Sequence, residues 1–337
     1  MKRGGRPGWR ILTPVAAVFL ILVLADLFLV HRLVGAPDRA TLLAGFYANP
    51  GTVVDDALIS DLGFTGDAIT KGKHPGTLRV LTLGGSVLFN RRFTGKLKAA
   101  LEKRLGRPVE VVGAAFRGHK TWASVRKLAL LSGYHFDYVV ICHGVNDLLA
   151  NNVAPEDFRE DYSHVNPWYR RGFLLDRSTI ARLFYNVFLH RRPPRRDPPG
   201  CLSGKVFSRN MERLVDETRG FGATPLLLTF AWTIPEGYSL ARFRKNEAGF
   251  VNPGNYDPCP VELWGPPGYV AECLEENNRA VRELAARKRV PLLDAEALLG
   301  KDPVLFGDFC HPNDRGVGIL TDAIAEKTAE LYSEKRS

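Results

Sequence analysis

Cysteine is scarce in this chain, and none of it is spaced for a structural metal site. The five cysteines are Cys142, Cys201, Cys259, Cys273 and Cys310. No two of them form the CxxC pair that is typical of structural zinc sites, so we expect none. Cys142 falls in an apolar run and is expected to be a packing residue. Cys201, Cys259 and Cys273 fall in or beside loop-rich segments, where two of them could pair in an oxidising compartment; the sequence leaves open which two.

Motifs of several other protein classes are missing as well. The segment GGSVL, which follows an early apolar run, lacks the second glycine of the G-x-S-x-G nucleophile elbow, and this disfavours an α/β-hydrolase. It also lacks the GxxxxGK[ST] pattern of a phosphate-binding loop.

The net charge of the chain is +10, but no nucleic-acid motif accompanies it, so we expect no nucleic-acid partner. Such an excess could favour anionic membrane surfaces or polyanionic glycans.

One long apolar run is present, at residues 11–30, where Asp26 is the only charge. A helix of this length spans about 30 Å, the thickness of a bilayer's hydrocarbon core. Residues 1–10 form a basic tail, which the positive-inside rule places in the cytoplasm. We therefore expect a transmembrane signal-anchor at residues 11–34, with the rest of the chain in the periplasm or outside the cell. A signal peptide cleaved after Val34-Gly35-Ala36 is the alternative.

The remaining chain divides into a tether at residues 35–76 and one large domain at residues 77–337. From residue 77, short apolar strands alternate with helical patterns, which indicates a parallel sheet with helices on both faces. The expected strands are Leu78–Leu83, Pro108–Val112, Phe136–Cys142, Leu226–Phe230 and Val290–Leu293. Segments rich in Pro and Gly at about 148–204 and 232–267 read as insertions over the site. The basic stretch Arg191–Arg196 in the first insertion is either a solvated loop or a surface for acidic glycans or lipids.

Polar residues that could carry chemistry follow these strands. Ser86, Gly118 and Asn146 each come after a predicted strand, so they should meet at the carboxyl edge of the sheet. Asp308 and His311 lie three residues apart near the C-terminus. A serine hydroxyl needs a base to become a nucleophile, and a carboxylate can orient a histidine for that task. Asp308 and His311 lack a convincing third ligand, so we expect no metal.

These segments, taken together, resemble the blocks of the SGNH/GDSL hydrolases. The first block is GGS, ending at Ser86, the second contains Gly118, the third is Gly144-Val145-Asn146-Asp147 and the last is Asp308 to His311. Two positions depart from the usual pattern: Gly85 stands where the family commonly has Asp, and Gly113 where it commonly has Asn. The resemblance implies a flavodoxin-like α/β/α sandwich with a five-stranded parallel sheet of order 2-1-3-4-5.

The resemblance also implies an activity and a set of roles. Ser86, His311 and Asp308 would form a catalytic triad, and Ser86, Gly118 and Asn146 an oxyanion hole, in a membrane-anchored serine esterase that needs no cofactor. Its substrate would be a small-molecule, glycan or lipid acyl ester. Two alternatives stay open: acyl transfer to or from cell-envelope polysaccharide, and a catalytically idle domain that binds a glycan or a partner. His143 reads as a structural strand-end histidine, and Asp147 alone could be only a helix cap.

Overall fold

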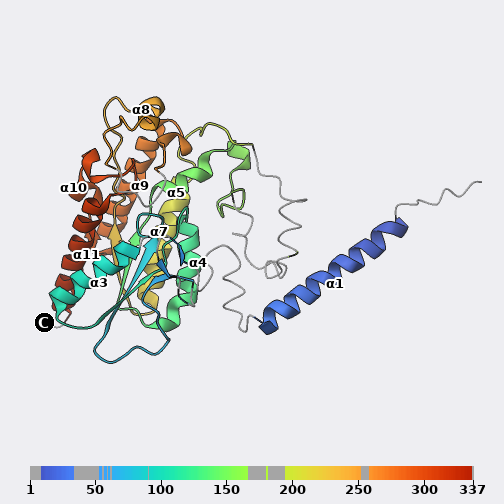
Figure 1. The fold of residues 1–337 in the computed structure, drawn as a ribbon, viewed down its shortest axis with the longest axis horizontal. Helices are drawn as coiled ribbons and strands as arrows, with labels where there is room; N and C mark the ends of the chain where they lie inside the picture. Colours follow the sequence, from blue (N-terminus) through green and yellow to red (C-terminus); the bar gives the residue numbers. More distant parts are fainter. Residues whose placement is uncertain are drawn as a thin grey trace, which may run out of the picture.

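A six-stranded mixed sheet forms the centre of the part of the chain described by the computed structural model (Figure 1). The described residues are 9–33, 53–54, 57–58, 60, 63–89, 91–165, 180, 194–251 and 258–335. The strands of this sheet are β3 (Thr65–Gly66), β4 (Leu78–Gly84), β5 (Val109–Gly113), β6 (Tyr138–Cys142), β7 (Thr224–Leu228) and β8 (Leu292–Leu293). A separate antiparallel pair consists of β1 (Val53–Val54) and β2 (Ala57–Leu58).

Helices follow most strands of the sheet, as the apolar periodicity predicts. The α-helices are α1 (Trp9–Leu33), α3 (Arg91–Leu105), α4 (Thr121–Leu131), α5 (Val145–Leu148), α7 (Gly204–Gly220), α8 (Leu240–Arg244), α9 (Pro267–Lys288), α10 (Ala295–Leu299) and α11 (Asp314–Glu334). Short 3₁₀ helices are η2 (Ser132–Tyr134), η3 (Leu149–Asn151), η4 (Pro155–Asp157), η8 (Val261–Leu263) and η9 (Pro303–Leu305).

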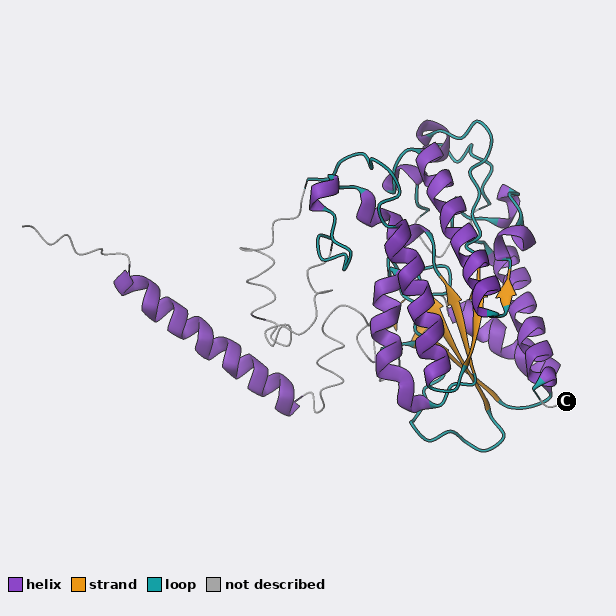
Figure 2. Cartoon of the chain, turned by 180° about the vertical axis from the view of Figure 1, so that it is seen from behind, coloured by secondary structure: helices purple, strands orange, loops and turns teal. Residues whose placement is uncertain are grey.

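The strands are buried on both faces, which explains their continuous apolar runs. Every residue of β4 is buried. Its alternate side chains face opposite ways: Val80 joins the core that contains residues of α3 and α11, whereas Leu81 joins the core that contains residues of α4 and α7. Figure 2 shows the resulting three layers, with helices on both sides of the strands.

The sheet differs from the expected one at its edge. Strands β5, β4, β6, β7 and β8 are parallel neighbours in that spatial order, but β3 pairs antiparallel with β5 through Thr65↔Gly113 and Gly66↔Val112. The expectation of a purely parallel sheet with five strands therefore needs correction, although the five parallel strands keep the expected order 2-1-3-4-5 among themselves. The sheet is mixed, and its full order is β3-β5-β4-β6-β7-β8. A two-residue strand has too few side chains to produce a pattern in the sequence.

The N-terminal expectation is tested only in part. A helix, α1, covers most of residues 11–34. Within the described ranges, however, no helix combines the length and the apolar character needed to cross a bilayer, contrary to the spanning segment expected there. Most of the basic tail and of the tether, and the central part of the first insertion, lie outside the described residues.

Candidate active site

Ser86 lies in a tight turn at the carboxyl end of β4. The strand ends at Gly84, and the backbone then folds back, with the Leu88 N–H donating to the Gly85 carbonyl and the Phe89 N–H donating to the Ser86 carbonyl, both at 3.2 Å. Helix α3 begins shortly after, at Arg91. The turn leaves Ser86 half-buried, so its hydroxyl stays within reach of a second chain segment.

That second segment is the loop between η9 and α11. The Gly307 N–H donates to the His311 carbonyl at 2.9 Å and closes the loop. Asn313 then caps α11, because its side-chain oxygen accepts hydrogen bonds from the N–H groups of Arg315 and Gly316. Its amide group also donates to the carbonyls of Val251 and Val304. Asp308 and His311 therefore sit on a short loop fixed at both ends.

A chain of hydrogen bonds joins three of the predicted site residues. His311 Nε2 lies 2.7 Å from Ser86 Oγ. On the other side of the ring, His311 Nδ1 lies 2.7 Å from Asp308 Oδ2 and 2.9 Å from Oδ1. Residues 225 positions apart in the sequence thus share one hydrogen-bonded network. These contacts place the Nδ1 proton of a neutral imidazole toward Asp308 and leave Nε2 to accept the serine proton.

Asp308 is held in its ionised form by its surroundings. Its side chain is 0% exposed, and burial alone would raise the pKa of this carboxyl. The His311 imidazole and the N–H groups of Cys259 and Cys310 outweigh the burial and lower the pKa below its ordinary value. Both backbone donors lie 2.9 Å from the carboxylate oxygens. A buried carboxylate with this many donors can orient a histidine and stabilise its protonated form.

Asn146 is close to the serine turn. It lies in α5, directly after β6, and is buried. Its Nδ2 group donates to the His119 carbonyl at 3.2 Å, which fixes the orientation of the amide and leaves a second N–H on the same nitrogen. The loop that carries His119 is tied to β4, because the Phe116 N–H donates to the Gly84 carbonyl at 3.3 Å. Gly118 belongs to this loop, is exposed and has φ +70°.

The two departures from the family pattern are places of close approach. A β-carbon on Gly85 would lie 2.4 Å from Asn146 Nδ2. A β-carbon on Gly113 would lie 2.2 Å from Thr65 Oγ1, which belongs to the extra strand β3. Neither site has room for a side chain unless its neighbour moves. The absence of a side chain at Gly85 and Gly113 therefore allows two close contacts, one with Asn146 in the site and one with Thr65 in the sheet.

His143 and Asp147 have structural partners around the third block. His143 Nε2 lies 2.8 Å from Ser124 Oγ, and burial, together with the charge of Lys127, lowers the pKa of His143 to about 3. The hydrogen bond to Ser124 is the kind of contact that the structural reading of His143 expects. The Asp147 carboxylate accepts hydrogen bonds from the Thr121 N–H and hydroxyl and from the Tyr162 hydroxyl, and it is fully buried. These bonds anchor the residue that follows Asn146.

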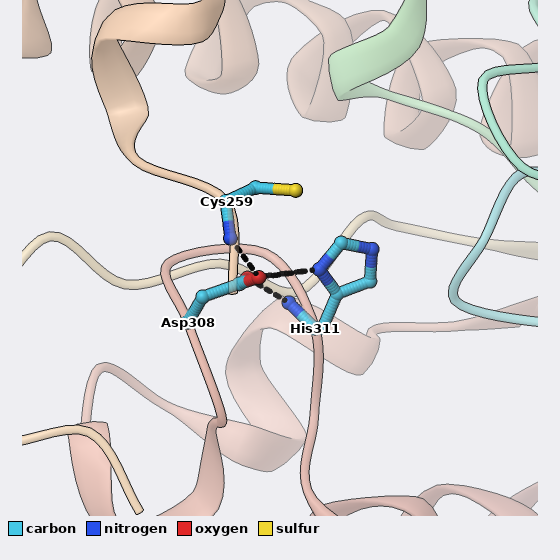
Figure 3. Close-up of side chains that lie close together, drawn as sticks. All are labelled: Cys259, Asp308 and His311. Carbon is cyan, nitrogen blue, oxygen red and sulfur yellow. Dashed lines mark hydrogen bonds and ion pairs between the residues drawn. The ribbon is translucent and has the colours of Figure 1, made fainter. Parts of the chain in front are cut away.

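Cys259 is the residue of this site that the sequence did not reveal. Its Sγ and ligand atoms of Asp308 and His311 all lie within 4.8 Å of one another. Figure 3 shows the Cys259 sulfur on the His311 side of the Asp308 carboxylate. Cys259 thus adds a candidate third ligand atom beside Asp308 and His311 that the sequence analysis did not include. Cys259 lies in the insertion at 232–267, which carries no periodic pattern from which its path could be predicted.

Comparisons with known proteins identify the family of the chain. The family model of the GDSL-like lipase/acylhydrolases matches residues 64–319. No curated protein matches the chain. Similar solved structures include a lipase/acylhydrolase from Enterococcus faecalis, at 16% identity over 75% of this chain and 96% of that one, with a TM-score of 0.43.

An acetylxylan esterase from Geobacillus stearothermophilus is also similar, at 14% identity over 77% of this chain and 96% of that one, with a TM-score of 0.42. At such low scores these likenesses say nothing about substrate. The family model alone spans most of the sequence, so the chain belongs to the GDSL-like lipase/acylhydrolase family and is a hydrolase of ester bonds.

Proposed function

We propose that the chain is a serine esterase in which Ser86 is the nucleophile, His311 the general base and then the general acid, and Asp308 the residue that orients His311. The observation that carries this proposal is the unbroken hydrogen-bond chain from Ser86 Oγ through both ring nitrogens of His311 to the Asp308 carboxylate. A serine hydroxyl is a weak nucleophile unless a base accepts its proton as it attacks. This geometry provides such a base.

In the first half of the reaction, Ser86 Oγ attacks the carbonyl carbon of an acyl ester, and its proton passes to His311 Nε2. The imidazolium that forms is stabilised by the Asp308 carboxylate, 2.7 Å from Nδ1. When the tetrahedral intermediate collapses, the C–O bond to the alcohol breaks and His311 gives its proton to the leaving oxygen. An acyl-Ser86 ester and a free alcohol result.

The negative charge on the tetrahedral intermediate needs donors that are already in place. We assign this task to the N–H groups of Ser86 and Gly118 and to the side-chain amide of Asn146. Support comes from the second N–H of Asn146 Nδ2, which remains available while the first is bound to the His119 carbonyl.

In the second half of the reaction, water attacks the acyl carbon. His311 accepts the water proton and returns it to Ser86 Oγ, and a carboxylic acid leaves.

The test is hydrolysis of short- and medium-chain p-nitrophenyl esters by the full chain in detergent, compared with its Ser86→Ala variant. We expect turnover to fall at least a thousandfold in the variant, because the nucleophile is removed. The chain-length profile of the active protein then defines the acyl group it accepts. Equal turnover in both proteins would refute the assignment of Ser86.

The same assay separates the other functions that the sequence left open. An acyltransferase would release little acid in water but would transfer the acyl group when a polysaccharide acceptor is added. An idle binding domain would do neither. Because Asp308 is buried and ionised beside His311, we favour an active site over an idle one.

We also propose that the esterase domain lies outside the cytoplasm. Support comes from the disulfide between Cys201 and Cys273, a bond typical of oxidising compartments. Fractionation of cells that express the chain tests this. Recovery of the intact chain in the fraction of soluble cytoplasmic proteins would contradict it.

A further inference from the structure

We propose that Cys259, Asp308 and His311 form an inhibitory site for a thiophilic divalent cation, with Zn²⁺ as the probe. One thiol, one carboxylate and one imidazole gather within 4.8 Å (Figure 3). Sulfur, nitrogen and oxygen from these residue types are the ligands that zinc takes in proteins, and three protein ligands with one open position make a complete tetrahedral site. Serine esterase chemistry has no use for the Cys259 thiol.

The distances suit a cation after a small closure. A tetrahedral zinc ion with bonds of about 2.0 to 2.3 Å keeps its ligand atoms roughly 3.5 Å apart. His311 Nδ1 and Asp308 Oδ2 are already 2.7 Å apart, so they need to separate slightly to admit the ion. Cys259 Sγ lies within 4.8 Å of both other ligand atoms, so it needs to come closer to share one ion with them. Asp308 is fixed by backbone donors, among them the Cys259 N–H. The half-buried Cys259 side chain is therefore the ligand that adjusts.

Binding at Nδ1 would stop the proposed reaction through the histidine tautomer. Nδ1 lies against the Asp308 carboxylate and Nε2 against the Ser86 hydroxyl, so the tautomer that suits the reaction carries its proton on Nδ1. A cation binds the lone pair of Nδ1, so Nδ1 must first lose its proton. The neutral ring then carries its proton on Nε2. Nε2 can no longer accept the proton of Ser86. The Cys259 thiol loses its proton to water as it becomes a thiolate ligand, so binding releases one proton overall and involves no oxidation.

Two thiols lie near His311, and we assign the cation to Cys259 and not to Cys310. A second sulfur, Cys310 Sγ, lies 3.5 Å from His311 Nδ1. Cys310 is 1% exposed and belongs to the same tight loop as Asp308. Cys259 is the more accessible of the two and shares a cluster with both other ligand atoms. Zinc sensitivity should therefore depend on Cys259 and not on Cys310.

The inhibition rests on the proposed function, so it is measured as a ratio within each protein. The full chain is stripped with a chelator and assayed on a p-nitrophenyl ester at increasing Zn²⁺, and each variant is scaled to its own zinc-free activity. We expect reversible loss of activity that EDTA restores. Cys259→Ala should raise the zinc concentration for half-inhibition at least tenfold, and the matched Cys310→Ala should leave it unchanged. Equal sensitivity of Cys259→Ala and the unaltered protein would overturn the inference, as would loss of sensitivity in Cys310→Ala alone.

A direct binding measurement keeps the two proposals separate. Co²⁺ bound to a thiolate gives a charge-transfer band in the near ultraviolet, and it can be titrated into the Ser86→Ala variant, which needs no activity. We expect the band to saturate at about one ion per chain and to vanish in Ser86→Ala/Cys259→Ala. If the unaltered protein had no esterase activity, this band would still test the site. If the protein were active but Ser86→Ala gave no band, the site would be refuted and the esterase retained.

Discussion

The side-chain amide of Asn146 occupies the space that a β-carbon on Gly85 would need, with 2.4 Å between Nδ2 and the position of that carbon. Gly85 immediately precedes Ser86, so the absence of a side chain there lets the amide reach the serine turn. The opposing atom is the end of a side chain, and it can move away without unfolding the domain. The contact therefore links the departure from the family's first block to the placement of one proposed oxyanion donor.

A Gly85→Ala variant should fold but catalyse poorly. The new methyl group would push Asn146 out of position and weaken one donor to the oxyanion, so we expect kcat to fall about 10- to 100-fold, with a smaller change in KM. The matched control is Gly95→Ala on α3, where a β-carbon meets nothing within 4 Å. That change should leave kcat unaltered and raise the melting temperature slightly. Unchanged kcat in Gly85→Ala would argue against the role of Asn146.

Asp308→Asn should reduce catalysis far more than it reduces stability. The amide has nearly the same shape but lacks the charge that stabilises protonated His311, and it offers fewer acceptors to the Cys259 and Cys310 N–H groups. We expect kcat to fall by about 10³- to 10⁴-fold. The same substitution at Asp314, whose carboxylate makes an exposed ion pair with Arg92, should change kcat by less than about twofold. Similar losses in both variants would contradict the assignment.

The Cys201–Cys273 disulfide should contribute measurably to stability. It joins the segment before α7 to α9 across 72 residues. Because the bond restricts the unfolded chain, replacing both cysteines by serine should lower the free energy of unfolding by about 2 to 4 kcal/mol. Urea denaturation with and without a reductant measures this. Reductant should destabilise the unaltered protein but not the double variant, and an equal effect on both would show that the bond does not form.

Buried Lys127 should make stability depend on pH. Its ammonium group is fully buried and donates to the Ala114 carbonyl, and burial lowers the pKa of Lys127 to about 7. Between pH 7 and about 10.5 the unfolded chain binds this proton and the folded chain does not, so stability rises with pH across that window.

Lys127→Met removes this dependence. Relative to the variant, the unaltered protein should gain on the order of a few kcal/mol as the pH rises from 7 to 10. Below pH 7 both states of the unaltered protein hold the proton, so the difference between the proteins should be constant there. Urea denaturation at several pH values measures the difference, and a flat difference from pH 7 to 10 would contradict the lowered pKa.

The sequence was sufficient to predict where the central site residues meet. Strands such as β4 and β6 are buried on both faces and therefore stand out as apolar runs. In a parallel sheet, residues that follow such strands converge on one edge, and Ser86 and Asn146 do lie there. Asp308 and His311 were found through the family's last block, since no local pattern indicates that their loop faces β4.

Other features had no signal in the sequence. Strand β3 is two residues long and exists through its pairing with β5, which depends on tertiary contact. Cys259 reaches Asp308 from an insertion rich in proline and glycine, where the backbone follows no repeating geometry. The pairing of Cys201 with Cys273 likewise depends on how the first insertion, at 148–204, packs against α9, and three candidate cysteines left it undecided.

The most direct test of the central claim is covalent capture of the nucleophile. The full chain is treated with a serine-directed fluorophosphonate, digested and examined by mass spectrometry for the modified residue. We expect a single phosphonylated serine, Ser86, with labelling that is abolished in Ser86→Ala and strongly slowed in His311→Ala, because the hydroxyl reacts only when its proton can pass to His311 Nε2. Labelling of another serine, or equal labelling of the unaltered protein and His311→Ala, would contradict the account.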